Sequence, residues 1–494
     1  MLEGGGTQMI STSNLDALFH PQSIAMIGAS NQRNKWGYRI LSNIVLGRYE
    51  GRIFPINPSE QHICGLNVYP SILDVPEPVD MALIVVPVPA VSRVIDECLA
   101  KGVRAAILIT AGFGEIGPEG RLMEAELARR ARRGGMIFTG PNCNGIISTP
   151  NHLYAMMLTT FPKFAQGGSV SMVTQSGNIG LSMLTRGVQN RVGFSKYVSS
   201  GNEACLRTEE LIEYFGEDPE SRVILTYIEG VKDGRRLFEA CRRVGPKKPI
   251  LLFKSGKTKG GAGAAQSHTG SIAGSNEIFD ALCRQTGVIR CGQLDEMFDL
   301  AAAFQRQPLP RGPRVGIITS GGGWGVLTSD ACEARGLEVG ALSAETIGEL
   351  DRRLPAWWSR NNPIDLVAGT GNRYELFKDC IDLLFGRDEV DAIILSGIGS
   401  TLLEQAQEGY VLNETEKQMI AVETTLADLI ADAIARYRRP IIPQTDLNAH
   451  ANPAENPLFK RLNDMGIMVL PDPERAAAVL GAMHRRHRYL ERLA

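Results

Sequence analysis

The sequence predicts an α/β protein with three Rossmann- or flavodoxin-like domains, each built on a doubly wound parallel sheet. Short apolar runs alternate with longer amphipathic segments along the chain, which is the pattern of strands that return through helices. A chain of 494 residues is too long for a single hydrophobic core and corresponds to about three domains. We place the domains at residues 1–145, 146–306 and 307–494.

The composition limits the class of protein. A net charge of −2 argues against nucleic acid or a membrane surface as a partner. The nine cysteines are scattered, with no CxxC pair and no zinc-type spacing, as in the reduced, buried thiols of a cytoplasmic protein. No apolar run reaches the roughly 18 residues of a membrane span, and residues 1–8 lack the apolar segment of a signal peptide. We expect a cytoplasmic protein without a metal site of its own.

The first domain is predicted to bind a ligand at the carboxyl ends of its strands, as other open parallel sheets do. Its strands are expected at residues 23–27, 52–56, 81–86 and 105–109, and its helices at 36–46, 90–101 and 119–133. The candidate ligand residues at the strand ends are Gly28, Ala29, Ser30, Asn57, Pro58, Val86, Pro87, Val88, Thr110 and Ala111.

The ligand of this domain is predicted to be coenzyme A, with NADP as the open alternative. A GxGxxG fingerprint is absent, because the next glycine after Gly28 is Gly37. The second strand ends in Asn57, where an NAD site has an acid for the ribose. An amide does not repel a phosphate near the ribose. The nearby cations that could neutralise such a phosphate are Arg33, Lys35 and Arg39.

Two segments are candidate phosphate sites, one where the second domain begins and one within it. The loop 140–145 follows a strand at 136–139, and residues 175–178 open a helix after a strand at 169–174. A helix start leaves N–H groups free at the positive end of the helix dipole, although an ordinary serine cap is the commoner explanation. For Cys143 we favour a buried small residue over a nucleophile. The phosphate candidates are Gln175, Ser176, Gly177, Asn178, Asn142, Cys143 and Gly145.

The next two strands, at 223–228 and 250–253, bring a carboxylate and an imidazole to the same edge of this sheet. Glu229 follows the first strand, and a loop of Lys, Gly, Ser, Thr and Ala (254–263) leads from the second to His268. A lone histidine in a loop is more often a surface residue, but a neutral imidazole also serves as nucleophile, base or metal ligand. A neighbouring carboxylate would fix its tautomer. Glu229 and His268 form the candidate catalytic pair.

The third domain is expected to begin after a proline-rich linker at 307–313. Its strands are expected at 314–319, 392–395, 441–442 and 467–470, with a helix at 326–335 and a charged helical stretch at 402–439. The glycine run 320–325 could bind phosphate, and the loop 361–365 is expected close to an interface.

Three motifs together resemble the NDP-forming acyl-CoA synthetase superfamily, which includes succinyl-CoA synthetase. The separation of 39 residues between Glu229 and His268 (268 − 229) fits the pairing in that family. In domain order, nearly the whole chain resembles the alpha subunit of ADP-forming acetate–CoA ligase. The motifs are Gly140-Pro141-Asn142-Cys143-Asn144-Gly145, Gln175-Ser176-Gly177-Asn178, and Ser267-His268-Thr269-Gly270-Ser271 preceded by Tyr227-Ile228-Glu229-Gly230.

The resemblance implies an acid–CoA ligase that converts a carboxylate, CoA and ATP into acyl-CoA, ADP and phosphate. It implies that His268 is transiently phosphorylated, that Glu229 hydrogen-bonds it, and that the third domain serves mainly packing and interaction. The chain has no GxxxxGK[ST] loop and no room for an ATP-grasp module, so ATP or ADP with Mg is expected on a separate beta-type subunit of a hetero-oligomer. The identity of the acid, and ADP against GDP, stay open.

Two alternatives to a ligase subunit are a non-catalytic CoA- or acyl-CoA-binding regulatory relative and an NADP-dependent oxidoreductase. Loss of the histidine or the glutamate would favour the regulatory protein, and both residues are present here. A hydride-transfer assay would reveal the oxidoreductase.

Overall fold

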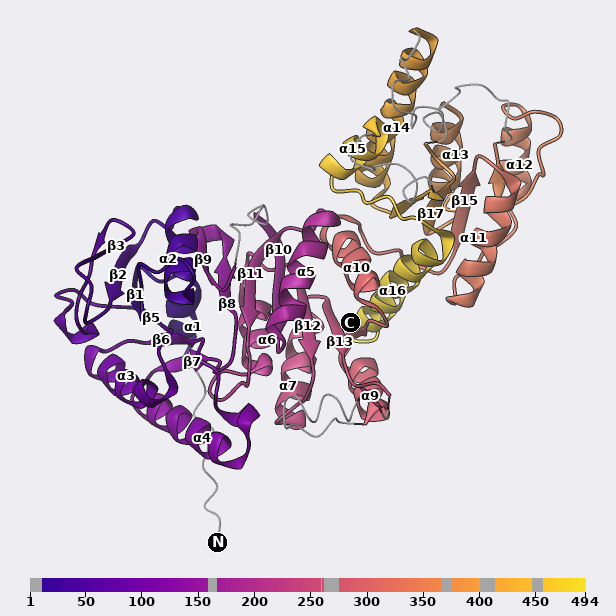
Figure 1. Ribbon diagram of the computed structural model, residues 1–494. Helices are drawn as coiled ribbons and strands as arrows, with labels where there is room; N and C mark the ends of the chain where they lie inside the picture. The colour runs from indigo at the N-terminus through magenta and orange to yellow at the C-terminus, as the bar shows by residue number, and fades with distance from the viewer. Residues whose placement is uncertain are drawn as a thin grey trace. The chain divides into compact units, whose positions relative to one another are not determined.

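The computed structural model describes residues 11–158, 167–258, 260–261, 275–366, 375–399, 414–446 and 456–494. The chain divides into two compact units, Met1–Leu294 (unit 1) and Asp295–Ala494 (unit 2), which Figure 1 colours from indigo to pink and from pink to yellow. Within these described ranges, no helix has the length and apolarity needed to cross a bilayer.

The first sheet of unit 1 is parallel and has the strand order β2-β1-β5-β6-β7. Every residue of β1, β5 and β6 is buried, as expected for strands that are covered on both faces. A small β3–β4 hairpin (His62–Ile63 and Leu66–Asn67) lies beside this sheet. The strands are β1 (Ser23–Ile27), β2 (Arg52–Ile56), β5 (Met81–Ile84), β6 (Ala105–Leu108) and β7 (Ile137–Thr139).

The helices of this sheet are α1 (Thr12–Phe19), α2 (Trp36–Leu46), α3 (Val88–Lys101) and α4 (Pro118–Arg133). α3 and α4 lie side by side (Figure 1). α2 packs against β1 and also against β9 (Leu153–Met156) of the second sheet. There Asn43 donates hydrogen bonds to two backbone carbonyls, Met156 at 3.1 Å and Leu158 at 3.3 Å. α2 therefore joins the two sheets of unit 1.

The second sheet of unit 1 has the order β14-β13-β12-β10-β11-β8-β9. Its first five strands are parallel, but β8 and β9 add an antiparallel hairpin to one edge, which the parallel prediction did not include. The strands are β8 (Gly145–Ser148), β9 (Leu153–Met156), β10 (Gly167–Thr174), β11 (Phe194–Ser199), β12 (Val223–Ile228), β13 (Ile250–Lys254) and β14 (Ile289–Arg290); the helices are α5 (Gly177–Gln189), α6 (Thr208–Glu217), α7 (Gly234–Val244) and α9 (Asn276–Thr286).

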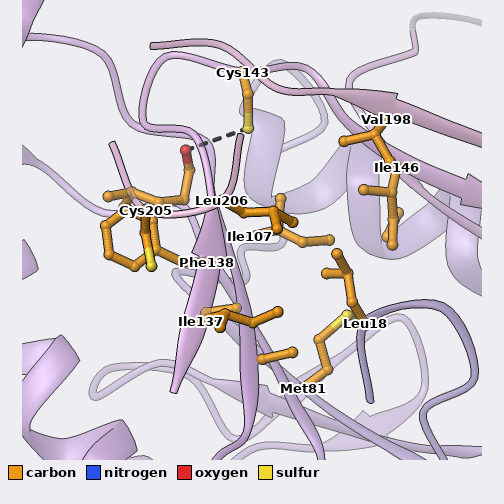
Figure 2. Packing of buried hydrophobic residues seen from close by; sticks show 14 of the residues in the cluster. Leu18, Met81, Ile107, Ile137, Phe138, Cys143, Ile146, Val198, Cys205 and Leu206 are labelled. Atoms are coloured by element: carbon orange, nitrogen blue, oxygen red, sulfur yellow. Dashed lines mark hydrogen bonds between the residues drawn. The ribbon is translucent and has the colours of Figure 1, made fainter. Parts of the chain in front are cut away.

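One hydrophobic core runs through both sheets of unit 1. Figure 2 shows Ile107, Phe138 and Met81 of the first sheet packed in the same cluster as Ile146 and Val198 of the second. Because the two sheets share their core, the strand ends of one are held in a fixed relation to those of the other.

Unit 2 contains a parallel sheet of order β16-β15-β17-β18 with its own core. The strands are β15 (Val315–Thr319), β16 (Ile364–Asp365), β17 (Ala392–Ser396) and β18 (Ile441–Gln444); the helices are α10 (Leu294–Arg306), α11 (Gly322–Ala334), α12 (Ala344–Asp351), α13 (Glu375–Gly386), α14 (Glu414–Tyr437), α15 (Pro457–Asp464) and α16 (Pro473–Glu491).

Two sequence-based expectations for unit 2 are wrong in detail. The helix expected from residue 326 begins at Gly322, so most of the glycine run is helical, because tertiary packing outweighs the low helix propensity of glycine. The strand expected at 467–470 is reduced to one bridge between Leu470 and Gln444.

Candidate functional site

The carboxyl edge of the first sheet depends on two glycines. Gly28 has a φ of +89°, and a Cβ there would lie 2.2 Å from the carbonyl oxygen of Val85. A Cβ on Gly37 would lie 2.0 Å from the carbonyl oxygen of Gly28. The start of α2 therefore packs directly on the turn after β1, as in other nucleotide-binding sheets where glycine permits close helix–strand approach.

The predicted CoA residues lie together at this edge. Asn57 donates a hydrogen bond to the carbonyl of Ala29 at 2.7 Å, and Thr110 donates one to the carbonyl of Val86 at 2.7 Å. Asn57 thus holds the turn after β1. Val88, expected in the loop before a helix at 90–101, is instead the first residue of α3, which begins two residues earlier than expected.

Exposed Arg33 and Lys35 precede α2, and the side chain of Lys35, the N-cap residue, makes no capping bond. The guanidinium of Arg39 stacks on Trp36 at 5.2 Å. Positive side chains therefore lie beside the first-turn N–H groups of α2, which favours an anionic ligand at this position.

The loop between β7 and β8 places Asn142 near the second sheet. Asn142 has a φ of +56°, and its side-chain amide donates to Asn202 at 3.2 Å. The side chain of the next asparagine, Asn144, packs against the start of α5. A Cβ on Gly177 would lie 2.5 Å from the Asn144 amide carbon, so only glycine permits this approach. Gly145, at φ +102°, opens β8. The two candidate phosphate segments are thus brought into contact.

Cys143, in contrast, turns into the core (Figure 2). Its side chain is only 3% exposed, and its Sγ donates to the carbonyl of Leu108 at 3.4 Å. Burial raises the pKa of this thiol to about 12, so it is not a thiolate at neutral pH. The expected burial of Cys143 is confirmed, and only its backbone is available to a phosphate.

The start of α5 has the features of an anion site. Its N-cap residue, Ser176, makes no side-chain capping bond, so the N–H groups of Asn178 and Ile179 lack the partner that a serine cap would supply. α5 continues to Gln189, long enough for a helix dipole.

The side chain of Gln175 is not part of this anion site. Its Oε1 accepts hydrogen bonds from the backbone N–H groups of Glu229 at 2.7 Å and Gly230 at 3.0 Å, and its Nε2 donates to the carbonyl of Gly230 at 2.8 Å. The amide therefore holds the turn after β12.

Glu229 lies at the carboxyl end of β12 and is 8% exposed. Its carbonyl accepts a hydrogen bond at 2.9 Å from Lys254, the last residue of β13, which is 1% exposed. His268 lies outside the described residues, and its pairing with Glu229 stays a prediction.

Sequence reasoning missed the roles of Lys254, Asn202 and Glu203. Asn202 and Glu203 follow β11, and the side-chain amide of Asn202 donates to Glu115 at 2.6 Å and to Glu124. A strand-end position was the only signal in the sequence for any of the three.

The comparisons with known proteins agree with this geometry. A model described as CoA binding domain matches residues 22–149, and one described as succinyl-CoA ligase like flavodoxin domain matches residues 167–304. The acetate–CoA ligase [ADP-forming] II subunit alpha of Pyrococcus furiosus is 38% identical over 447 residues, which cover 89% of this chain and 95% of the relative.

A longer relative and a solved structure extend the match. The acetate–CoA ligase [ADP-forming] I of Archaeoglobus fulgidus is 39% identical over 381 residues, covering 77% of this chain but 54% of the relative. The dinucleotide forming acetyl-coenzyme A synthetase 1 of Ca. Korarchaeum cryptofilum, in complex with phosphate and ADP, has a TM-score of 0.83 and 32% identity over 97% of this chain and 99% of that chain.

Proposed function

Since the chain belongs to the NDP-forming acyl-CoA synthetase family, among the alpha subunits of ADP-forming acid–CoA ligases, we propose how its parts divide the work. Residues 1–145 bind CoA, residues 146–306 carry the phosphohistidine chemistry, and residues 307–494 serve packing and interaction. The observation that carries the proposal is one strand-end edge in unit 1 that combines the uncapped start of α5, the loop of Asn142 and Asn144, and Glu229.

CoA is proposed to lie at the carboxyl edge of the first sheet, with its phosphates near Arg33, Lys35 and the start of α2. The start of α2 packs on the turn after β1, and its N-cap residue makes no side-chain capping bond, so N–H groups of its first turn are proposed to bind these phosphates. The shared core of unit 1 would then hold the CoA thiol in a fixed relation to the start of α5.

The proposed chemistry takes place at the start of α5. Run from acyl-CoA, phosphate attacks the thioester carbonyl, and the products are an acyl phosphate and CoA. The imidazole of His268 then takes the phosphoryl group and releases the carboxylate, and ADP receives the phosphoryl group from His268. Helix N–H groups stabilise the charge on the phosphoryl oxygens, and Glu229 orients the imidazole.

ATP or ADP with Mg is proposed to bind on an ATP-grasp subunit. Two features support a partner chain: the P. furiosus relative is named a subunit, and this chain spans about half the length of the A. fulgidus relative. Acetate is the first acid to test, because it is the acid in the names of both relatives. We place the assembly in the cytoplasm.

Phosphate labelling tests the function. The protein is incubated with acetyl-CoA and radiolabelled phosphate, then with partner subunit and ADP. We expect an acid-labile, base-stable label that is lost in His268→Asn and kept in His152→Asn, a matched control at a residue with φ +52° that asparagine also adopts. Label and turnover retained in His268→Asn would refute the proposal, and hydride transfer with NADP would support the oxidoreductase.

A further inference from the structure

We infer that Gln175 is a positioning residue for Glu229, held in its orientation by Glu203, and not a phosphate ligand. The inference rests on the proposed function, because it concerns the turn that carries the glutamate of the candidate pair. The three residues follow three neighbouring strands of the second sheet. Glu203 follows β11, Gln175 follows β10, and Glu229 follows β12.

The turn after β12 is held by side chains on both sides. Gln175 accepts from the N–H groups of Glu229 and Gly230 and donates to the Gly230 carbonyl. From the other side, Lys254 donates to the Glu229 carbonyl. Both backbone polar groups of Glu229 are thus fixed by buried or half-buried side chains, and little freedom remains in the direction in which its carboxyl group leaves the backbone.

Glu203 fixes the Gln175 amide. Glu203 is 4% exposed and has a φ of +52°. Its carboxylate accepts hydrogen bonds from Ser200 at 2.8 Å and from Thr208 at 2.5 Å, and the side-chain amide of Gln175 acts on it in the same direction, lowering its pKa. Burial raises the pKa of Glu203, and these hydrogen bonds act in the opposite direction. A buried carboxylate held by two hydroxyl donors is a rigid partner.

The hydrogen-bond pattern requires an amide at position 175. The oxygen of Gln175 accepts from two N–H donors, whereas its nitrogen donates to one acceptor, the Gly230 carbonyl. The amide also interacts with a second acceptor, the Glu203 carboxylate, whose pKa it lowers. A carboxylate would satisfy the donors but would set its second oxygen against both acceptors. The amide nitrogen therefore already donates to the Gly230 carbonyl, and the Glu203 carboxylate with which it also interacts would repel a phosphate.

The test measures the turnover of acetyl-CoA, phosphate and ADP in the presence of the partner subunit, as a function of pH and phosphate concentration, together with the radiolabel on His268. In Gln175→Glu we expect a fall in kcat of about 10²-fold at pH 8, by comparison with the loss of one preorganised donor, with KM for phosphate unchanged. Two carboxyl groups in contact share a proton, so the introduced group has a raised pKa. The variant should therefore recover relative to wild type as the pH falls.

Two further variants isolate the Gln175–Glu203 contact. Gln175→Glu combined with Glu203→Gln exchanges donor and acceptor, so it should regain about tenfold in kcat at pH 8 and lose the extra pH dependence. Glu209→Gln is the matched control: Glu209 is also buried, at 5% exposed, and burial raises its pKa to about 7. Its loss should change kcat less than twofold.

The outcomes separate the two proposals. If wild-type protein takes no label, the proposed function fails before the variants are compared. If wild type is labelled and Gln175→Glu raises KM for phosphate at constant kcat, Gln175 is a phosphate ligand and the inference is overturned. The same holds if the variant loses the same factor at every pH, or if the double variant, folded by circular dichroism, shows no recovery.

Discussion

Replacing Asn202 by alanine should loosen unit 1 where its two sheets meet. The side chain of Asn202 donates to Glu115 at 2.6 Å and to Glu124, and it accepts from Asn142 at 3.2 Å. Glu124 is 6% exposed and has one other donor, the N–H of Gly114 at 2.9 Å. We call these four side chains, Asn202, Glu115, Glu124 and Asn142, the Asn202 joint.

The magnitude follows from these bonds. A hydrogen bond to a charged group contributes about 1.5–3 kcal/mol, and the variant loses two of them. Glu115 is partly exposed, so in the variant water can replace its lost hydrogen bond, whereas the buried Glu124 is left without this donor. We therefore expect the free energy of unfolding to fall by about 3 kcal/mol, the cost of leaving one buried charged group without a hydrogen bond. For a unit of this size, that corresponds to a fall in Tm of roughly 6–12 °C.

The loss should depend on pH. Burial acts to raise the pKa of Glu115, but hydrogen bonds from the Gly112 N–H and Asn202 hold it below its usual value. A carboxyl group with a lowered pKa stabilises the fold fully above its unfolded pKa, about 4.3, and the contribution disappears as the pH falls through the folded pKa. The difference between wild type and variant should be full at pH 7.5 and shrink below about pH 4.

Differential scanning calorimetry at several pH values is the assay. Asn190→Ala is the control, because its side chain donates only one bond, to the Arg186 carbonyl at 2.8 Å. If Tm decreases by less than about 2 °C at pH 7.5, the free energy of unfolding has changed by under 1 kcal/mol for such a unit, and the reasoning is refuted. A fall that is equally large well below pH 4, where Glu115 is protonated in both states, would refute it as well.

Two other predictions concern CoA and a buried ion cluster. Gly37→Ala should weaken CoA binding by tenfold or more, on the order of the 1.4 kcal/mol that separates decades of affinity, because its Cβ would lie 2.0 Å from the Gly28 carbonyl oxygen; Gly234→Ala, with nothing within 4 Å, is the control. Equal affinities in a calorimetric titration would contradict it. Lys196→Met removes a fully buried cation from Asp218 at 2.8 Å and Glu220 at 2.7 Å and should cost about 3 kcal/mol at pH 7. Burial opposes ionisation of Asp218, but hydrogen bonds from Lys196 and Ser221 lower its pKa, so the cost should diminish as the pH falls through that pKa; a pH-independent cost would argue against the ion pair.

The sequence predicts the parallel strands well, because they are buried on both faces and form continuous apolar runs. Ser23–Ile27 and Val223–Ile228 lie where expected, to the residue. The hairpin Gly145–Ser148 and Leu153–Met156 was missed, since each strand has only four residues and the segment between them carries no strong hairpin turn signal. Short strands take their stability from neighbours that are distant in sequence.

The candidate site shows the same division. The positions of Gln175 and Glu229 after parallel strands predicted that both lie along one edge of the second sheet, but the prediction assigned Gln175 to a phosphate site. Which partner a polar side chain takes depends on the backbone of another strand, here the N–H groups of Glu229 and Gly230. Lys254 likewise reads as the polar end of a strand, and only the fold directs its amine to the Glu229 carbonyl.

The shared core of unit 1 limits how a gene for such a protein can be rearranged. Phe138 and Cys143 lie before residue 145, whereas Ile146, Val198 and Leu206 lie after it, and all five belong to one buried cluster. A split between the first two predicted domains would expose this apolar surface to water on both fragments, which favours aggregation. Recombination should therefore keep the coding sequence of the two sheets together. Breakpoints that yield a folded protein are expected nearer the boundary of the two units, at residues 294 and 295.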